Sequence, residues 1–182
     1  MSELILASGS PRRRELLKLI TEDFTVVPAG CEERFVGTLP PADAVKALAK
    51  QKAEYVSVKY PDKTVIGADT TVFCGNDPLG KPKDDKDAKR MLKMLSGRTH
   101  SVITAVAIAK GGKVQKLFAE ETQVEFYPVS ENEIEEYIST GEPMDKAGAY
   151  GIQGKGALLI KGITGDYYNV MGLPVARLLR EM

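Results

Sequence analysis

A run of three arginines at positions 12–14 follows the sequence Ser8-Gly9-Ser10-Pro11 near the start of the chain. The second serine is a good helix N-cap and the proline suits the first helical position, so the arginines fall in the first turn of a helix. Positive side chains are unfavourable there, because the helix dipole already makes that end positive. The run therefore favours a bound phosphate held by Ser8, Arg12 and Arg13, with a solvated basic helix start as the alternative.

Carboxylates form a second candidate group. Asp69 follows the apolar run Val65–Ala68, which we expect to be a strand that ends there, and α/β proteins bind ligands at strand ends. An acid in that place, followed by Thr70, suits a divalent cation or the activation of water. Glu32 and Glu33 lie in an expected loop and would add a second carboxylate. The alternatives are a turn residue at Asp69 and a solvated glutamate pair.

Two lysines occupy places that suggest contact with an anion. Lys52 interrupts the apolar stripe of an expected helix from Pro41 to about Tyr60, so its ammonium either snorkels to the surface or reaches a polar site. Lys81 lies in the Gly/Pro-rich segment Leu79–Asp84, which suits either a phosphate contact or an ordinary surface turn.

The glycine-rich segment Asp145–Gly154 carries Gln153, whose amide offers a hydrogen-bond donor and an acceptor side by side. That pair matches the N3–H and O4 edge of uracil or thymine, and the glycines let the backbone approach a flat ligand. A purely structural loop is the alternative. His100 is the only histidine, so a histidine metal cluster is excluded and we interpret it as structural.

The strands and helices expected along the chain do not alternate strictly. This order predicts an α/β fold with a mixed, elongated and strongly bent sheet flanked by helices. Gly111-Gly112 is expected in a hairpin, and Ser130 with Glu133 forms a capping box. The expected strands are Glu3–Ala7, Phe24–Val27, Thr64–Ala68 with Thr71–Phe73 pairing beyond it, Ser101–Ala109, Val114–Phe126 and Ala157–Ile163. The expected helices follow Ser10, run from Pro41 to Tyr60 and from Asp85 to Leu95, open at Ser130 and follow Pro174.

Composition predicts one globular domain over all 182 residues. The 25 basic and 25 acidic residues balance, which argues against a general nucleic-acid-binding surface. No stretch approaches the roughly 20 apolar residues of a membrane span, and the apolar run at the start is too short for a signal peptide. Cys31 and Cys74 match no redox or zinc spacing, so we expect two reduced, buried thiols in a cytoplasmic protein.

Seven short motifs in order give this chain its resemblance to a known family. They run from Leu6 to Pro174 and read SGSPRR, EE, GADT, GKP, SGRTH, DKAGAYGIQG and NVMGLP. Together they resemble the Maf family of nucleotide pyrophosphatases. The resemblance implies a single Maf-like domain with a fold like that of the inosine triphosphate pyrophosphatases, two lobes around a cleft and often a homodimer.

Site roles also come from this resemblance. It makes Asp69 the proton acceptor, assigns phosphate contacts to Arg12 and Arg13, and places Glu33, Lys52 and Lys81 in the cleft. It places base selection at Arg12, Thr70 and Gln153. A divalent cation, Mg²⁺ or Mn²⁺, is implied as cofactor, and we expect Glu33 and Asp69 to hold it.

The pattern AYGIQG after DKAG resembles the branch of the family that acts on dTTP and UTP. The resemblance therefore implies a pyrophosphatase that cleans the nucleotide pool by releasing the monophosphate and pyrophosphate. A regulator of septum formation that senses nucleotides without turnover is the alternative. A kinase is disfavoured, because the chain lacks GxxxxGK[ST] and a GxGxxG before a helix.

Overall fold

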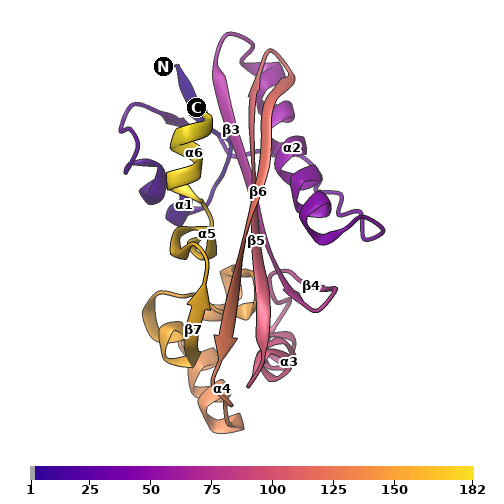
Figure 1. Cartoon of the computed structure of the whole chain (residues 1–182), viewed down its shortest axis with the longest axis vertical. Helices are drawn as coiled ribbons and strands as arrows, with labels where there is room; N and C mark the ends of the chain where they lie inside the picture. The colour runs from indigo at the N-terminus through magenta and orange to yellow at the C-terminus, as the bar shows by residue number, and fades with distance from the viewer. Residues whose placement is uncertain (1–2) are drawn as a thin grey trace. The chain divides into compact units, whose positions relative to one another are not determined.

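The computed structural model describes residues 3–182, which divide into two compact units. The first unit runs to Thr70 and also contains Thr104–Glu120 and Gly172–Met182. The second unit contains Thr71–Ile103 and Glu121–Met171. Three strands of one seven-stranded mixed sheet run through both units, and the strand order is β2-β1-β3-β5-β6-β7, with β4 also paired to β3 (Figure 1).

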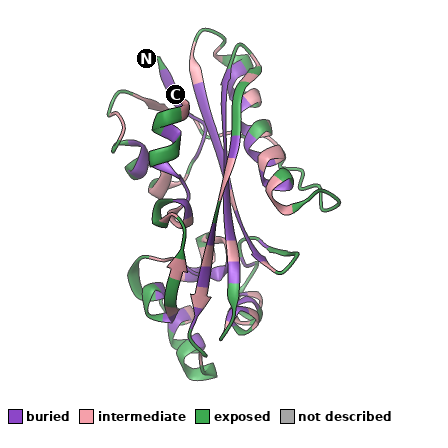
Figure 2. Ribbon diagram, in the orientation of Figure 1, coloured by how far each residue is buried: buried purple, intermediate pink, exposed green. Residues whose placement is uncertain are grey.

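The first unit begins with a parallel arrangement in which β1 pairs with both β2 and β3. Buried apolar residues line β1 and the first part of β3, whereas β2 is more exposed, and the burial of β3 is visible in Figure 2. Its elements are β1 (Leu4–Leu6), α1 (Pro11–Leu17), β2 (Thr25–Val26), α2 (Pro41–Lys59), the first part of β3 (Thr64–Cys74), parts of β5 (Thr99–Lys110) and β6 (Lys113–Phe126), and α6 (Val175–Glu181).

Helix α2 packs on the sheet through an apolar stripe at helical spacing, as the sequence predicts. Val56 from this stripe packs with Ile5 and Val65 of the parallel strands and with Ala7, which follows β1. The β5–β6 hairpin turns at Gly111-Gly112, where positive φ angles of 57° and 75° suit glycine.

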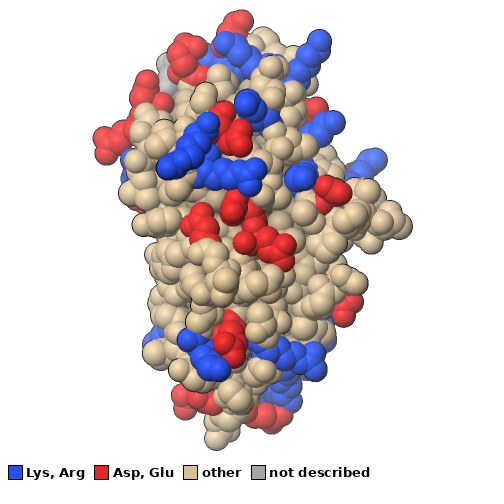
Figure 3. All heavy atoms as spheres, viewed as in Figure 1, with Lys and Arg blue, Asp and Glu red and all other residues tan. Residues whose placement is uncertain are grey.

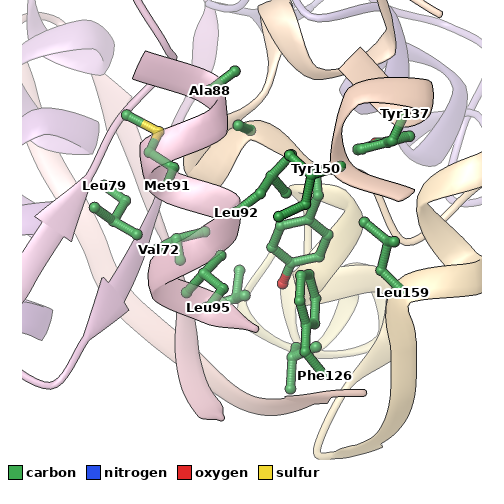
Figure 4. Packing of buried hydrophobic residues seen from close by; sticks show 14 residues of the cluster. Val72, Leu79, Ala88, Met91, Leu92, Leu95, Phe126, Tyr137, Tyr150 and Leu159 are labelled. Atoms are coloured by element: carbon green, nitrogen blue, oxygen red, sulfur yellow. The ribbon is translucent and has the colours of Figure 1, made fainter. Parts of the chain in front are cut away.

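The second unit has its own apolar core, shown in Figure 4. Residues from β3, α3, β6, α4 and the glycine-rich segment meet there, with the Tyr150 ring packed edge-on against Phe126. Its elements are the rest of β3, β5 and β6, β4 (Asp77–Leu79), α3 (Asp85–Leu95), α4 (Glu131–Ser139), three short 3-10 helices η1 (Glu142–Asp145), η2 (Ala147–Ala149) and η3 (Gly154–Leu159), β7 (Ile160–Thr164), and α5 (Tyr167–Met171).

Helix boundaries in the second unit agree closely with the sequence. Helix α3 has the predicted bounds, and α4 opens with the predicted capping box of Ser130 and Glu133. The last predicted strand is partly wrong, because residues 157–159 form the end of η3 and β7 begins only at Ile160. Helix α5 was not predicted.

The strand that carries Asp69 also differs from the prediction. Instead of ending at Ala68, β3 continues without a break to Cys74, so Asp69 lies inside a strand rather than at its end. Threonine is favourable in strands, which allows the polar residues after Ala68 to continue the strand. The pairing with β1 ends at Ile66, so Asp69 still lies beyond the carboxyl end of the neighbouring strand.

Both cysteines are free, but each is half-buried instead of fully buried as expected. Cys31 lies in the loop after β2, and Cys74 is the last residue of β3, where neither is enclosed by the core. Within residues 3–182, none of the helices combines the length and the apolar character that crossing a membrane requires.

Candidate functional site

A buried ion pair lies on the inner face of α2. The Nζ atom of Lys52 lies 2.6 Å from Oδ1 of Asp69 and 3.0 Å from Oε1 of Glu33. Lys52 and Asp69 are only 9% and 8% exposed, whereas the Glu33 side chain is half-exposed. The lysine therefore reaches a polar site instead of snorkelling to the surface. Three residues far apart in the sequence are brought together here as expected.

Gly67 is what allows α2 to lie close enough to β3 for this pair to form. A Cβ atom at Gly67 would lie 2.6 Å from the backbone N of Ala53 and 2.7 Å from the backbone O of Ala49. Both contacts are shorter than real Cβ atoms make, and both are with helix backbone that cannot turn aside. The glycine two residues before Asp69 thus sets the approach of the helix that carries Lys52.

Arg13 forms a second polar group in the first unit. Its Nη2 donates to Oγ1 of Thr70 at 2.8 Å, its Nη1 to Oγ of Ser8 at 3.3 Å, and its Nε to the carbonyl of Gly172 at 2.8 Å. The Thr70 hydroxyl is also hydrogen-bonded to Oγ1 of Thr104, at 2.8 Å. Three of the five guanidinium N–H donors therefore connect α1 to β3 and to the start of the C-terminal segment.

The electrostatics of Arg13 connect it to the ion pair. Partial burial lowers the pKa of its guanidinium, whereas the charges of Asp69 and Glu33 act in the opposite direction. Arg12, which is also half-buried in the first turn of α1, lowers the same pKa through like-charge repulsion. Charges of both signs therefore act on Arg13, whose guanidinium contacts Thr70 next to Asp69.

The start of α1 is built as the sequence indicates. Ser10 is the N-cap, and its hydroxyl accepts the backbone N–H of Arg13 at 3.4 Å. The Ser8 hydroxyl is buried and accepts the backbone N–H of Ser10 at 3.2 Å. Ser8 therefore shapes the turn into α1 as well as contacting the guanidinium.

Of the two adjacent glutamates, only Glu33 contacts the buried pair. Glu32 instead lies 3.5 Å from Nη2 of Arg34, and both of these side chains are well exposed. An exposed pair of this kind contributes little to stability. Position therefore distinguishes the two glutamates, and the one beside the buried pair is Glu33, which the family resemblance assigns to the cleft.

Residues that sequence reasoning did not assign complete the Arg13 group. Thr104 is fully buried in β5, and a hydroxyl within the otherwise apolar run 102–109 was the signal that could have found it. Gly172 lies in the NVMGLP motif with φ of 119°, and a Cβ there would lie 3.5 Å from Oγ1 of Thr70 and 3.6 Å from Nε of Arg13. Both distances are ordinary contacts, so it is the positive φ that favours glycine at this position.

The remaining candidates, Lys81 and Gln153, are exposed on two loops of the second unit. Lys81 follows β4, and its loop is anchored by the buried Pro82. Gln153 precedes η3. The two loops are tied together, because the backbone N–H of Gly148 donates to the carbonyl of Gly80 at 3.1 Å.

His100 is buried beside the glycine-rich segment. Its Nε2 lies 2.6 Å from the hydroxyl oxygen of Tyr150, and its ring meets Phe126 edge-on. Burial lowers the pKa of His100 to about 4, so the ring is neutral near pH 7. Burial also raises the pKa of Tyr150, whose hydroxyl therefore keeps its proton. This environment fits the structural interpretation of His100.

Charged side chains on the face in Figure 3 form separate small groups of both signs. Within residues 3–182, no group of three or more His, Cys, Asp and Glu side chains gathers as a metal site would require. Two carboxylates, Glu33 and Asp69, do converge on one point, the Nζ of Lys52. Mg²⁺ is commonly held by one or two carboxylates together with substrate phosphates and water, and this pair fits that mode.

The chain also resembles known proteins over nearly its whole length. It is 52% identical over 179 residues to a dTTP/UTP pyrophosphatase of Bacillus velezensis, a match that covers 98% of this chain and 94% of the relative. It is 51% identical over 182 residues to a dTTP/UTP pyrophosphatase of a Geobacillus species, covering 100% of this chain and 97% of the relative.

A solved structure supports the fold. A HAM1 protein from Coxiella burnetii matches 100% of this chain and 98% of its own with a TM-score of 0.53 and 13% sequence identity. This likeness concerns the fold alone and confirms the predicted mixed α/β architecture. The family model described as Maf-like protein matches residues 3–182. The chain therefore belongs to the Maf family.

Proposed function

We propose that this chain is a nucleoside triphosphate pyrophosphatase that hydrolyses dTTP and UTP to the monophosphate and pyrophosphate. The observation that carries the proposal is full-length similarity, near 50% identity, to relatives named dTTP/UTP pyrophosphatase. The chemistry of the first unit supports it independently, because that unit gathers a buried acid, a buried lysine and two arginines around one short segment of β3.

Asp69 is the group we assign to proton transfer. In the proposed step, the Asp69 carboxylate takes a proton from a water molecule whose oxygen attacks the α-phosphorus. A new oxygen–phosphorus bond forms, the bond from the α-phosphorus to the bridging oxygen breaks, and pyrophosphate leaves with the bonding electrons. Lys52 holds the carboxylate in place through the 2.6 Å contact.

The cationic residues contribute positioning and charge stabilisation, which account for most catalysis in phosphoryl chemistry. Arg12, Lys52 and Lys81 are proposed to contact the phosphates. Arg13 uses three N–H groups internally, so its proposed role combines a phosphate contact with fixing Thr70 and Ser8.

We propose that Glu33 and Asp69 hold a divalent cation, Mg²⁺ or Mn²⁺, that arrives with the nucleotide. When bound, such an ion offsets negative charge on the phosphate oxygens. Entry of the ion would require Lys52 to share the two carboxylates with it, since its Nζ now contacts both.

Base selection is assigned to Arg12, Thr70 and Gln153 from the motifs that contain them. Gln153 supports the pyrimidine preference, since its amide matches the imide edge shared by thymine and uracil. A role in cleaning the nucleotide pool, a cytoplasmic location and a homodimer are further parts of the proposal, and sedimentation analysis measures the last of these.

A panel of nucleotides tests the proposal. Purified protein is incubated with Mg²⁺ and dTTP, UTP, CTP, ATP or 7-methyl-GTP, and pyrophosphate and single phosphate are assayed separately. We expect pyrophosphate from dTTP and UTP at the highest kcat/KM. Release of single phosphate, or binding without any turnover, would refute it, and the second result would favour the nucleotide-sensing regulator.

A further inference from the structure

Gln153 cannot by itself distinguish uracil from cytosine. Its amide presents one acceptor and one donor, which match the N3–H and O4 of uracil. If the amide rotates by half a turn about the last torsion of the side chain, the same donor and acceptor match the N3 and the amino group of cytosine. A preference for UTP over CTP therefore depends on where the amide is held against the base, and the first requirement is a fixed position of the backbone that bears Gln153.

One anchor lies immediately after Gln153. The carboxylate of Glu142 accepts the backbone N–H of Lys155 at 3.1 Å and that of Gly156 at 3.5 Å. These N–H groups open the 3-10 helix η3, whose N-cap residue is Gln153, and the Gln153 side chain does not cap it. Glu142 therefore does the capping and leaves the Gln153 amide available for a ligand.

The geometry around Glu142 is tight. Gly154 has φ of 63°, and a Cβ atom there would lie only 2.5 Å from Oε1 of Glu142. The position thus favours glycine for its backbone conformation, and a larger residue there would force the Glu142 carboxylate to shift. The Glu142 carbonyl in turn accepts a hydrogen bond from Nζ of Lys146 at 2.6 Å, which holds the residue from its other side.

A second anchor lies ahead of Gln153. The buried Tyr150 hydroxyl is hydrogen-bonded to Nε2 of His100, and the next residue, Gly151, donates its N–H to the hydroxyl of Tyr137 at 3.1 Å. Ala149, which precedes Tyr150, has φ of 61°, a strained conformation for a residue with a side chain. Such strain persists only where the surroundings fix the backbone, as these tyrosines do.

We propose that Glu142 and Tyr150 are positioning residues that hold the backbone on the two sides of Gln153 and thereby limit the positions from which its amide can meet a pyrimidine edge. The proposal rests on the dTTP/UTP function above and concerns the second unit only. His100 supports the Tyr150 anchor, because its Nδ1 has no hydrogen-bond partner within residues 3–182 and its Nε2 contact is the ring's polar link to the loop.

The test compares kcat/KM for UTP and for CTP in the wild type and in the variants Glu142→Ala and Tyr150→Phe. Each variant removes one anchor, and Tyr150→Phe keeps the ring packing on Phe126. We expect the UTP-to-CTP ratio to fall about tenfold in each, because a mobile amide matches either base. The kcat for UTP should change less than its KM, since neither residue is assigned to the chemical step.

Matched controls come from the same unit. Glu136→Ala removes a glutamate on the exposed side of α4, and Tyr127→Phe removes the hydroxyl of a tyrosine that is 51% exposed. Both should keep the wild-type ratio. If Glu142→Ala does not fold, Glu142→Gln keeps the side-chain size and one acceptor, and the ratio should still fall about threefold.

The outcomes separate the two proposals. A wild type that prefers UTP, with variants that keep the same ratio, would overturn the positioning roles and leave the proposed function intact. A wild type that takes UTP and CTP equally would overturn both the base preference and the fixed amide. Faster hydrogen exchange at the Lys155 amide in Glu142→Ala, together with a lowered ratio, supports the inference directly.

Discussion

Lys52 interrupts the apolar face of α2 and places its Nζ 2.6 Å from Oδ1 of Asp69, with both side chains only 11% exposed. A charge buried to this degree is stable only when it is paired, so each residue depends on the other. The pair joins the longest helix of the chain to the strand that carries the proposed catalytic acid. It therefore links the stability of the first unit to its chemistry.

Lys52→Met is expected to lower the free energy of unfolding by about 3 kcal/mol, because it leaves the Asp69 carboxylate buried without its closest cation. Urea denaturation measures this loss. In the double variant with Asp69→Asn, the carboxylate charge is absent as well, so the combined loss should be smaller than the sum of the two single losses. Strictly additive losses would contradict the dependence of the two residues on each other.

Asp69→Asn is expected to keep the fold and lose about 100-fold or more in kcat, which is a typical effect of removing a general base. The amide has the same shape as the carboxylate but cannot take a proton from water. Steady-state release of pyrophosphate from dTTP, with circular dichroism to check folding, provides the measurement. Activity within a few fold of the wild type would end the assigned role of Asp69.

Gly67→Ala should both destabilise the chain and reduce activity. The new Cβ atom would lie 2.6 Å from the backbone N of Ala53, so α2 must move away from β3 and carry Lys52 with it. We expect a loss of about 2 kcal/mol in the free energy of unfolding, as overpacking typically causes. The control is Gly30→Ala, where a Cβ atom would meet nothing within 4 Å. Equal unfolding midpoints for the two variants would contradict the role of Gly67.

Much of the fold follows from local sequence signals. The bounds of α3 and the capping box of α4 agree with the prediction because Asp84 and Ser130 are strong N-caps that act through their immediate neighbours. The strand through Asp69 could not be predicted in the same way, since its continuation depends on pairing partners distant in the sequence. The boundary of β7 was missed for a similar reason, because η3 is held by Glu142 from another segment.

The sequence predicted which residues belong to the candidate site better than it predicted the contacts between them. The sequence favoured neither alternative for Lys52, snorkelling to the surface or reaching a polar site. Only the packing of α2 on β3 places its ammonium beside Asp69. The internal contacts of Arg13 with Thr70 and Gly172 join segments from both ends of the chain. No local pattern predicts such contacts, although the SPRR, GADT and NVMGLP motifs named the residues. The expectation of two lobes around a cleft stays a prediction.

The lowered pKa of His100 leads to a prediction about how the stability of the chain depends on pH in mild acid. Burial lowers it to about 4, from an ordinary value of 6.5, so between these values the unfolded chain binds a proton that the folded chain does not. The free energy of unfolding is therefore at its full value above pH 6.5. It falls by up to about 3 kcal/mol as the pH is lowered toward 4. Urea denaturation across this range should show a slope that His100→Gln lacks. The same slope in both proteins would contradict the assignment.

The position of attack on the nucleotide is the central claim, and heavy-oxygen water tests it most directly. The protein is allowed to hydrolyse dTTP in water enriched in the heavy isotope, and the products are separated and weighed by mass spectrometry. Attack on the α-phosphorus predicts the label in thymidine monophosphate and none in pyrophosphate. Label in pyrophosphate, or in single phosphate, would contradict the account.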